Sequence, residues 1–454
     1  MDIQNINNYF FIGIAGDGMS AIAQYLTGIN KNVSGSDRQF SSENKNKRRR
    51  QLEEANIKCF PQDTSGLNSD IELVVISTAI EPTVPEYKKA IDLGIPIAMR
   101  SDLLAAISQT KKTIAVSGTS GKSTVSAMIY HIFNETQNNA SLITGAGLVS
   151  IIKQGKIGNA IAGKGDYLVI EADESDGSLV KYKPEIGIIL NIDKDHKELE
   201  ELDVLFDTFS KNSKNLIVND ANERSKKFSL NPKNDFGYSE NVGFKISNFE
   251  QNGFHISFKI NDVKFELNQI GKHNAENVAA AVSACNFAGI SIEDCAKALK
   301  TYEGIYRRHQ VILKTKNITI IDDYAHNPAK LSASIKACQF TDTKLIAWFQ
   351  PHGFKPTKFL RNDFVKEISE ALREEDEIWM SEIYYAGGTV SKDISAEDLI
   401  NDLKAKGKNA FYVKDRNNFP KEIKTHLAKN TVILLTGARD PSLKEFAEFV
   451  KNNI

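Results

Sequence analysis

The sequence has few cysteines, almost no net charge and no long hydrophobic run. Its four cysteines, Cys59, Cys285, Cys295 and Cys338, form no C-x-x-C pair, which favours buried, reduced thiols. The formal net charge is −1, so no overall field would steer the chain toward nucleic acid or a membrane surface. Any anionic ligand must therefore be bound by local groups.

The N-terminal residues MDIQNINNYFFIGIAG lack a basic region and any extended apolar run. Their apolar stretch ends at glycines well before the roughly 20 residues that a membrane span needs. We therefore expect a cytoplasmic protein without membrane insertion. With 454 residues, 41% of them hydrophobic and 25% charged, the chain has a globular composition and room for two to four domains.

Short apolar runs alternate with amphipathic stretches, which predicts an α/β protein with parallel sheets. Strand-like runs include YFFIGIAG and ELVVISTAI early in the chain, TIAVSG and EIGIILNID in the middle, and KLIAWFQP and TVILLTGARD near the end. From residue 243 to 270 apolar and polar residues alternate, which predicts an antiparallel β insert. We predict three domains: Rossmann-like 1–110, a P-loop ATPase-like central domain 111–312 with the insert, and Rossmann-like 313–454.

The stretch TIAVSGTSGKSTV, residues 113–125, predicts a strand that runs into a phosphate-binding loop. The general P-loop spacing G-x-x-x-x-G-K-[ST] would place a glycine at position 116, where this chain has Val116. Lys122 could neutralise the terminal phosphates, and the Ser123 hydroxyl could ligate Mg²⁺. The predicted nucleotide-binding residues here are Gly118, Thr119, Ser120, Gly121, Lys122, Ser123 and Thr124.

Acidic residues follow the next buried strand, in YLVIEADESDGS. They are Glu171, Asp173, Glu174 and Asp176, at the place where a metal contact beside a phosphate loop is expected. An ordinary acidic loop is the alternative. His196 ends the motif NIDKDH and is either a further Mg²⁺ ligand or a surface histidine.

Several motifs together carry a resemblance to a known family. GTSGKST, EADESDGS, NIDKDH, GKHNAEN, the pair Arg307-Arg308 and DDYAHNP, in this order, resemble the ATP-dependent Mur ligases of peptidoglycan synthesis. The phosphate loop of these ligases lacks the first glycine of the general P-loop pattern, the position that Val116 occupies in this chain. The resemblance implies ATP and Mg²⁺ as cofactors and amide formation through an acyl phosphate.

The resemblance also implies roles for individual residues. It places Lys122 on the terminal phosphates, Ser123, Glu171 and His196 on magnesium, His273, Asn274 and Asn277 at adenine, Arg308 at the γ-phosphate, Asp323 at the ribose, and His326 and His352 on the amino-acid side. Lys122, His196, Arg308 and His352 are the expected catalytic residues. The alternatives are a helix N-cap with Asn277 on a polar face, and a linker salt bridge for Arg308 or Asp323.

Within the family, FIGIAGDGMSAIA and VSGSD resemble the branch that joins L-alanine to UDP-N-acetylmuramate. The implied residues that bind the uridine nucleotide are Gly13, Gly16, Gly18, Met19, Ser20, Asp37 and Ser77. Their glycine order is G-x-x-G-x-G, and taken alone these glycines could equally serve NAD. The expected partners are UDP-N-acetylmuramate and an amino acid, with no nucleic acid, and the expected assembly is a monomer or weak dimer.

The third domain departs from the pattern of that branch. In FQPHGFKPTKF, Gly353 and Pro356 stand where arginines that hold the amino-acid carboxylate would be expected. Arg439, in TGARD, could replace them or could pair with Asp440. The missing arginines favour, as an alternative, a recycling ligase that adds a whole tripeptide. A nucleotide-binding paralogue with little ligase activity and a P-loop phosphotransferase are further alternatives.

Overall fold

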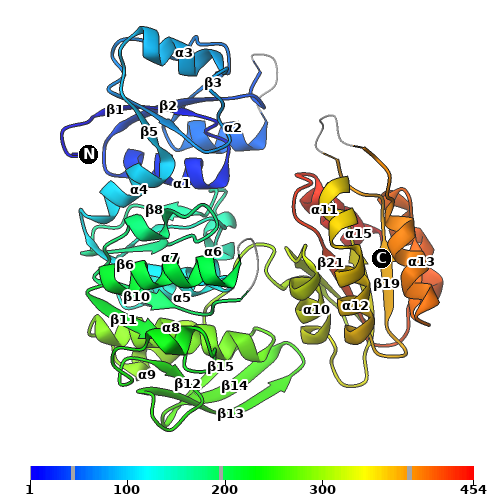
Figure 1. Cartoon of the computed structure of the whole chain (residues 1–454). Coiled ribbons are helices and arrows are strands. Elements are labelled where there is room, and N and C mark those ends of the chain that lie inside the picture. The colour runs from blue at the N-terminus through cyan, green and yellow to red at the C-terminus, as the bar shows by residue number, and fades with distance from the viewer. Residues whose placement is uncertain (1, 42–45, 194–197, 386–390) are drawn as a thin grey trace. The chain divides into compact units, whose positions relative to one another are not determined.

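The structure is a computed structural model of the chain and describes residues 2–41, 46–193, 198–385 and 391–454. It divides into two compact units, which run from blue to green and from olive to red in Figure 1. The first unit comprises residues 1–250, 256–268 and 272–306. The second unit comprises residues 251–255, 269–271 and 307–454.

The first unit begins with a five-stranded parallel sheet of order β3-β2-β1-β4-β5. Its strands are β1 (Asn8–Ile12), β2 (Asn32–Asp37), β3 (Lys58–Pro61), β4 (Leu73–Ile76) and β5 (Ile97–Met99). Its helices are α1 (Asp17–Gly28), α2 (Lys47–Glu54), α3 (Pro85–Asp92) and α4 (Arg100–Ser108). Because β1 lies between β2 and β4, the strand order reverses there, at the edge where such sheets bind ligands.

A second, six-stranded sheet follows in the same unit, with order β11-β10-β6-β9-β7-β8. Its strands are β6 (Lys112–Ser117), β7 (Ser141–Ile143), β8 (Ala160–Ile161), β9 (Tyr167–Glu171), β10 (Ile186–Ile189) and β11 (Asn215–Val218). Only β8, which pairs with β7, is antiparallel. Helices α5 (Lys122–Glu135), α6 (Val149–Ile152) and α7 (Leu199–Asn212) and the 3₁₀ turns η1 (Ser178–Lys181) and η2 (Ser225–Phe228) connect the strands.

The predicted β insert forms a four-stranded sheet of order β12-β13-β14-β15. Its strands are β12 (Phe236–Gly237), β13 (Phe244–Asn252), β14 (His255–Ile260) and β15 (Val263–Leu267), followed by helices α8 (Lys272–Phe287) and α9 (Ile292–Leu299). The antiparallel pairing is confirmed for β14 and β15, whereas the short β12 runs parallel to β13. Helix α8 packs against α5, so the insert shares a hydrophobic core with the central sheet.

The second unit holds a sheet of order β16-β17-β21-β18-β19-β20 with helices on both faces (Figure 1). Its strands are β16 (Gln310–Lys314), β17 (Ile318–Asp323), β18 (Lys344–Phe349), β19 (Glu377–Met380), β20 (Asn409–Tyr412) and β21 (Thr431–Thr436). The helical elements are α10 (Pro328–Ala337), α11 (Phe354–Phe359), α12 (Arg361–Ala371), α13 (Ala396–Ala405), η3 (Arg416–Asn418), α14 (Phe419–Glu422), η4 (Ile423–His426) and α15 (Leu443–Asn453). Only β16 is antiparallel to its neighbour.

The tip of the β insert belongs to the second unit, a feature that the sequence pattern does not predict. Phe254, between β13 and β14, packs edge-on against Phe340 with ring centroids 4.6 Å apart. Ile270 is buried in the hydrophobic core that α10 and α12 cover. Local periodicity carries no information on such contacts, because the partner residues lie far along the chain.

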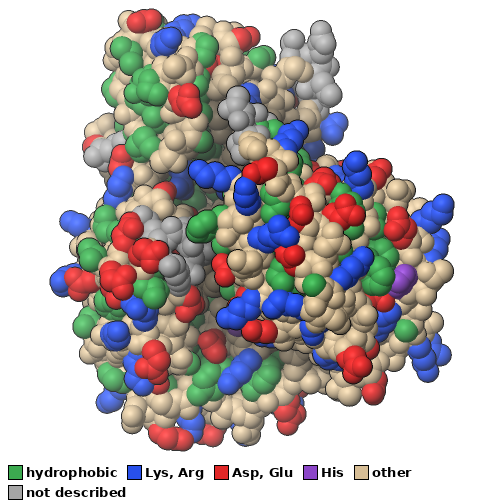
Figure 2. All heavy atoms as spheres, turned by 45° about the vertical axis from the view of Figure 1, so that its right-hand side comes forward, with side chains coloured by type: hydrophobic (Ala, Val, Ile, Leu, Met, Phe, Trp, Pro, Cys, Tyr) green, Lys and Arg blue, Asp and Glu red, His purple; other side chains and the backbone are tan. Residues whose placement is uncertain are grey.

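The predicted α/β fold class is confirmed, with three largely parallel sheets and a β insert. The four cysteines are buried and none of them is in a disulfide bond, as expected. Within the described ranges, no helix combines the length and the apolar character that crossing a membrane requires. Lys, Arg, Asp and Glu side chains are interspersed over the face shown in Figure 2, in line with the small net charge.

Candidate functional site

The loop that follows β6 is held in shape by Asn191. The Oδ1 atom of Asn191 accepts hydrogen bonds from Ser120 N at 2.8 Å and from Thr119 Oγ1 at 2.9 Å, and its backbone oxygen accepts from Thr119 N at 3.1 Å. Asn191 comes just after β10, the strand that pairs with β6. Gly121, in the left-handed region at φ +86°, caps the N-terminus of α5. The first N–H groups of α5 thus open at the loop, as phosphate binding requires.

The first turn of α8 lies against this loop. A Cβ atom added to Gly121 would lie 2.8 Å from Asn277 Oδ1, so the two residues are in close contact. Asn274 and Asn277 are 4% and 8% exposed, and Asn277 Nδ2 donates a hydrogen bond to Asn274 Oδ1 at 3.1 Å. His273 beside them is exposed. The structure therefore brings the predicted adenine-side residues to the predicted phosphate loop.

Substituting Gly118 with alanine is expected to destabilise the protein and to weaken nucleotide binding. Its φ is +135°, and an added Cβ would lie 3.0 Å from Leu190 Cβ and 3.1 Å from Asn191 N. Backbone strain of this kind costs on the order of 1–3 kcal/mol. Thermal unfolding and ATP titration measure the two effects.

Gly94→Ala is the matched control for Gly118→Ala. Gly94 also has a positive φ, +66°, but an added Cβ there would have no neighbour within 4 Å. This control therefore carries backbone strain without a clash near the phosphate loop. Equal losses of ATP affinity in the two variants would contradict the assignment of the loop.

Lys122, the first residue of α5, is partly buried among acidic side chains. Its Nζ lies 2.7 Å from Glu174 Oε2 and 3.6 Å from Asp173 Oδ1, and it donates a hydrogen bond to the Gly118 carbonyl at 2.7 Å. Burial lowers the pKa of Lys122, but the carboxylates of Glu174, Asp173 and Glu171 outweigh this and hold the pKa above its usual value. Lys122 is therefore a permanent positive charge beneath the loop. Glu174, 3% exposed, is its principal partner.

The other acids after β9 each contact a different group. Glu171 accepts hydrogen bonds from Thr144 Oγ1 and, at 2.8 Å, from Gly145 N. Asp176 pairs with Arg100 at 2.8 Å. The sequence motif EADESDGS is thus a set of specific contacts and not a solvated acidic loop.

Of the predicted magnesium ligands, the structure describes two. Ser123 is the second residue of α5, which follows β6, and Glu171 ends β9, which pairs with β6 in a register that sets Val116 opposite Glu171. Both side chains are partly exposed, and both offer the oxygen ligands that Mg²⁺ prefers. His196 lies outside the described residues. Within those residues, no group of three or more His, Cys, Asp or Glu side chains is arranged to hold a metal ion.

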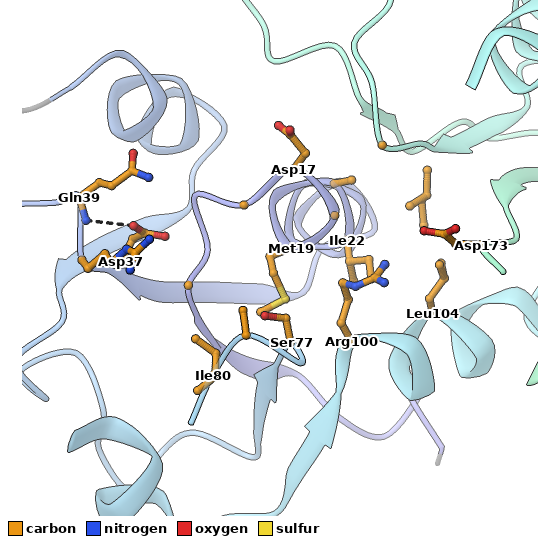
Figure 3. A pocket seen from close by; sticks show the side chains of 18 of the residues that line it. Asp17, Met19, Ile22, Asp37, Gln39, Ser77, Ile80, Arg100, Leu104 and Asp173 are labelled. Carbon is orange, nitrogen blue, oxygen red and sulfur yellow. Dashed lines mark hydrogen bonds between the residues drawn. The ribbon is translucent and has the colours of Figure 1, made fainter. Parts of the chain in front are cut away.

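A cavity of about 770 Å³ opens at the carboxyl edge of the first sheet (Figure 3). The predicted residues that line it are Gly13, Gly16, Gly18, Met19, Asp37 and Ser77. Asp37 accepts hydrogen bonds from Ala15 N and Gln39 N, both at 3.0 Å, which shapes the loops on either side. Ser20 does not line the cavity: it is fully buried, and its Oγ donates to the Asp17 carbonyl at 3.0 Å.

The cavity continues from the glycine loop, which we define as residues 13–18 from the end of β1 into the first turn of α1, to the second sheet of the same unit. Its far end is lined by Ile143, Thr144, Gly145, Glu171 and Asp173. Asp173 is the carboxylate that lies 3.6 Å from Lys122. A single cavity therefore reaches from the predicted uridine-nucleotide loop to the neighbourhood of the phosphate loop.

Arg100 lines the same cavity and is a residue that the sequence analysis did not select. A Cβ added to Gly18 would lie 3.2 Å from Arg100 Nη1, so the guanidinium rests directly on the glycine loop (Figure 3). Arg100 begins α4 directly after β5. This position at the carboxyl end of a strand could have identified it in the sequence, because ligands bind there in parallel sheets. Its ion pair with Asp176 links the first sheet to the acidic motif.

The adjacent arginines of the second unit differ in their surroundings. Arg307 is buried, its Nε lies 2.9 and 3.1 Å from the two carboxylate oxygens of Asp322, and its Nη2 donates to the Gly437 carbonyl at 2.9 Å. Arg308 is exposed, with its guanidinium 5.2 Å from the centre of the Tyr324 ring. Arg308 is thus the one of the two whose charge can reach a ligand.

Asp323 is buried and organises the loop after β17. Its carboxylate accepts hydrogen bonds from His309 N and Ala325 N, both at 2.8 Å. Burial raises the pKa of Asp323, but His309, Arg308 and these amides outweigh it and hold the pKa below its usual value. The carboxylate is therefore charged at neutral pH.

His326 and His352 lie side by side, with ring centroids 5.7 Å apart. The Nδ1 atom of His326 donates a hydrogen bond to the Tyr324 carbonyl at 2.9 Å. Burial, His326 and Arg439 lower the pKa of His352 to about 4. His352 is therefore a neutral imidazole at pH 7.

The cations near His352 have different partners. Lys358 pairs with Asp393, and Asp440 pairs with Arg416 at 2.6 Å and not with Arg439. The interpretation that Arg439 pairs with Asp440 is therefore wrong. Arg439 itself is exposed.

Comparison with known proteins identifies three consecutive family segments. Residues 8–112 match the Mur ligase family, catalytic domain; residues 116–285 match the Mur ligase middle domain; and residues 307–439 match the Mur ligase, glutamate ligase domain. In chain order, the three matched ranges correspond to the three largely parallel sheets.

Curated relatives are similar over almost the whole chain. The UDP-N-acetylmuramate–L-alanine ligase of Carboxydothermus hydrogenoformans is 33% identical, over 94% of this chain and 93% of its own. The protein of the same name from Dictyoglomus turgidum is 33% identical, over 96% and 94%.

Solved structures are also similar over almost the whole chain. The UDP-N-acetylmuramate-alanine ligase of Thermotoga maritima superposes with a TM-score of 0.81 at 25% identity, over 98% of both chains. A murein peptide ligase from Psychrobacter arcticus shares the fold, with a TM-score of 0.66 at 18% identity. The identity to the curated relatives extends over nearly the full length and includes all three segments, and the chain therefore belongs to the Mur ligase family.

Proposed function

We propose that this chain is an ATP-dependent ligase that joins L-alanine to the lactyl carboxylate of UDP-N-acetylmuramate during peptidoglycan precursor synthesis. The continuous cavity of the first unit is the observation that carries the proposal. It is lined by Gly13 and Asp37 at one end and by Glu171 and Asp173 at the other. A uridine nucleotide bound at the glycine loop would extend its sugar toward the phosphate loop.

The proposed division of labour follows the three segments. Residues 1–110 bind the UDP substrate, with Arg38 and Arg100 as the cations that line the described cavity. Residues 111–312 bind ATP through the loop 118–124 and through His273, Asn274 and Asn277. Residues 313–454 hold the amino acid near His326 and His352, while Arg308 and Asp323 serve the γ-phosphate and ribose.

The reaction requires activation of a carboxylate, which is a poor electrophile. Transfer of the γ-phosphoryl group of ATP to the lactyl carboxylate releases ADP and forms an acyl phosphate. The two reacting groups are both anions, so Lys122 and Arg308 would reduce their repulsion and stabilise the charge in the transition state. Ser123, Glu171 and His196 would hold Mg²⁺, which would neutralise further phosphate charge.

The second step is attack of the amino group of L-alanine on the acyl carbon, with loss of phosphate and of one proton. The amine must be uncharged to react. The neutral ring of His352, whose pKa is about 4, adds no positive charge that would repel an ammonium group on its approach.

The cofactors, partners and location complete the proposal. Mur ligases depend on ATP, and we assign Mg²⁺ to this chain on the oxygen ligands of Ser123 and Glu171. UDP-N-acetylmuramate and L-alanine are the proposed substrates, without nucleic acid. We propose that the protein acts in the cytoplasm as a monomer or weak dimer.

Phosphate release tests the proposed function. Incubation with ATP, Mg²⁺ and UDP-N-acetylmuramate should give release that depends on L-alanine, and exceeds that with L-serine, glycine or the tripeptide. Release that depended on the tripeptide instead would support the recycling ligase, which the absence of arginine at Gly353 and Pro356 favours. ATP binding without turnover of any acceptor would support the paralogue with little ligase activity.

A further inference from the structure

Three loops of the second unit meet at the carboxyl edge of its sheet. They follow β17, β18 and β21, which are neighbouring parallel strands. Phe349 and Thr436 are register partners, and Gln350 N donates a hydrogen bond to the Thr436 carbonyl at 3.2 Å. His326 follows β17, His352 follows β18 and Arg439 follows β21, so the three side chains start from adjacent loops.

The acidic side chains at the ends of β17 and β21 and in the loops that follow them are buried and already bonded. Asp322 contacts Arg307, and Asp323 contacts two backbone amides. Asp440 contacts Arg416 Nη1 at 2.6 Å and accepts from Ser442 Oγ at 2.5 Å. Among the described residues of these three loops, the exposed charge is therefore positive.

Few of the described cations at this edge are available to a ligand. Arg307 and Arg416 are engaged by Asp322 and Asp440, and Lys358 is engaged by Asp393. Lys355 is exposed on the first turn of the short helix α11. Arg439 is exposed too, and it belongs to the loop that Asp440 and the Gly437 carbonyl anchor on either side.

We propose that Arg439 binds the α-carboxylate of the acceptor amino acid, and so determines that the acceptor carries one. A guanidinium can hold a carboxylate with two parallel hydrogen bonds, which a lysine cannot. The position suits this role because the carboxylate would be held on the β21 loop while the amine faces the histidines. Arg439 and His352 follow the neighbouring strands β21 and β18, and the positive charge of Arg439 is one of the causes that lower the pKa of His352. This inference rests on the proposed ligase function.

Steady-state kinetics of the full chain tests the role of Arg439. Arg439→Gln should raise the KM for L-alanine about 10–100-fold, because a charge-assisted pair is lost. The KM for UDP-N-acetylmuramate should stay unchanged, and kcat should change little, since the carboxylate is bound equally before and during the reaction. The KM of Arg439→Lys for L-alanine should lie between those of the unsubstituted protein and Arg439→Gln, because lysine keeps the charge but lacks the planar guanidinium.

A second measurement compares L-alanine with L-alaninamide, which lacks the carboxylate. The unsubstituted protein should prefer L-alanine, and Arg439→Gln should lose most of that preference. Lys355→Gln is the matched control and should keep both the KM and the preference. An unchanged KM in Arg439→Gln, or a raised KM in Lys355→Gln alone, would overturn the role of Arg439. Absence of turnover with L-alanine in the unsubstituted protein would overturn the proposed function as well.

Discussion

Lys122→Ala is expected to lower ATP turnover at least about 10³-fold, while binding of the uridine nucleotide stays nearly unchanged. Lys122 is the partly buried cation under the proposed phosphate loop, and its Nζ lies 2.7 Å from Glu174 Oε2. The proposed uridine-nucleotide loop lies at the other end of the cavity, which Lys122 does not line. Phosphate release measures the first effect, and calorimetric titration with UDP-N-acetylmuramate measures the second.

The stability of the Lys122→Ala variant needs its own control. Removal of the ammonium leaves the Glu174 carboxyl buried, and an unpaired buried charge costs about 3–5 kcal/mol. Burial already raises the pKa of Glu174, so this carboxyl is expected to take up a proton in the variant. The double variant Lys122→Met with Glu174→Gln removes both charges and should recover stability without recovering turnover. Turnover in the double variant, or loss of uridine-nucleotide binding in the folded single variant, would contradict the assignment.

Arg307 and Arg308 are expected to respond to substitution in opposite ways. Arg308→Ala should lower kcat about 10²–10³-fold with no loss of thermal stability, because this exposed guanidinium is the one proposed to meet the γ-phosphate. Arg307→Met should instead lower the free energy of unfolding by about 3–5 kcal/mol, because Asp322 loses its buried partner. Steady-state kinetics and denaturant unfolding of both variants separate the two roles.

The effect of Arg307→Met should depend on pH in a definite direction. Burial raises the pKa of Asp322 to about 6 although Arg307 opposes the shift, and removal of Arg307 would raise it further. A carboxyl whose pKa is higher in the folded state binds more protons there, so its stabilising effect is lost as the pH rises through that value. The variant should therefore be closer to the unsubstituted protein at pH 5 than at pH 8. An equal loss at both pH values, or an equal loss of stability in Arg308→Ala, would refute this division.

The strand, glycine loop and helix of the proposed phosphate loop could be predicted from the sequence because their determinants are local. Gly118 and Gly121 adopt positive φ values, Lys122 begins the helix, and β6 is buried from its second residue to its last. The cavity residues Gly13 and Asp37 were found for the same reason, since each follows or ends a predicted strand. Ser20 shows the limit of this reasoning: it lies on the same helix as Met19 but points into the protein.

The motif suggests a choice between Arg307 and Arg308, but local sequence gives no physical ground for it. The two adjacent arginines have identical side chains and the same secondary-structure propensity. The structure distinguishes them because Asp322 and the Gly437 carbonyl are close to Arg307 alone. The same holds for Arg439, for which the sequence leaves open a pair with Asp440 or a bound carboxylate. The ion pair between Arg416 and Asp440 removes the first of these alternatives.

Sequence patterns were sufficient to predict the α/β fold class, the order of the sheets along the chain and the membership of the Mur ligase family. Only the folded chain shows which side chains meet: Asn191 with the phosphate loop, Glu174 with Lys122, and Arg100 with Asp176. The physical reason is the range of the interactions. Apolar periodicity and glycine conformation act within a few residues, whereas these contacts join residues 71, 52 and 76 positions apart, which only the strand order of the folded sheets brings together.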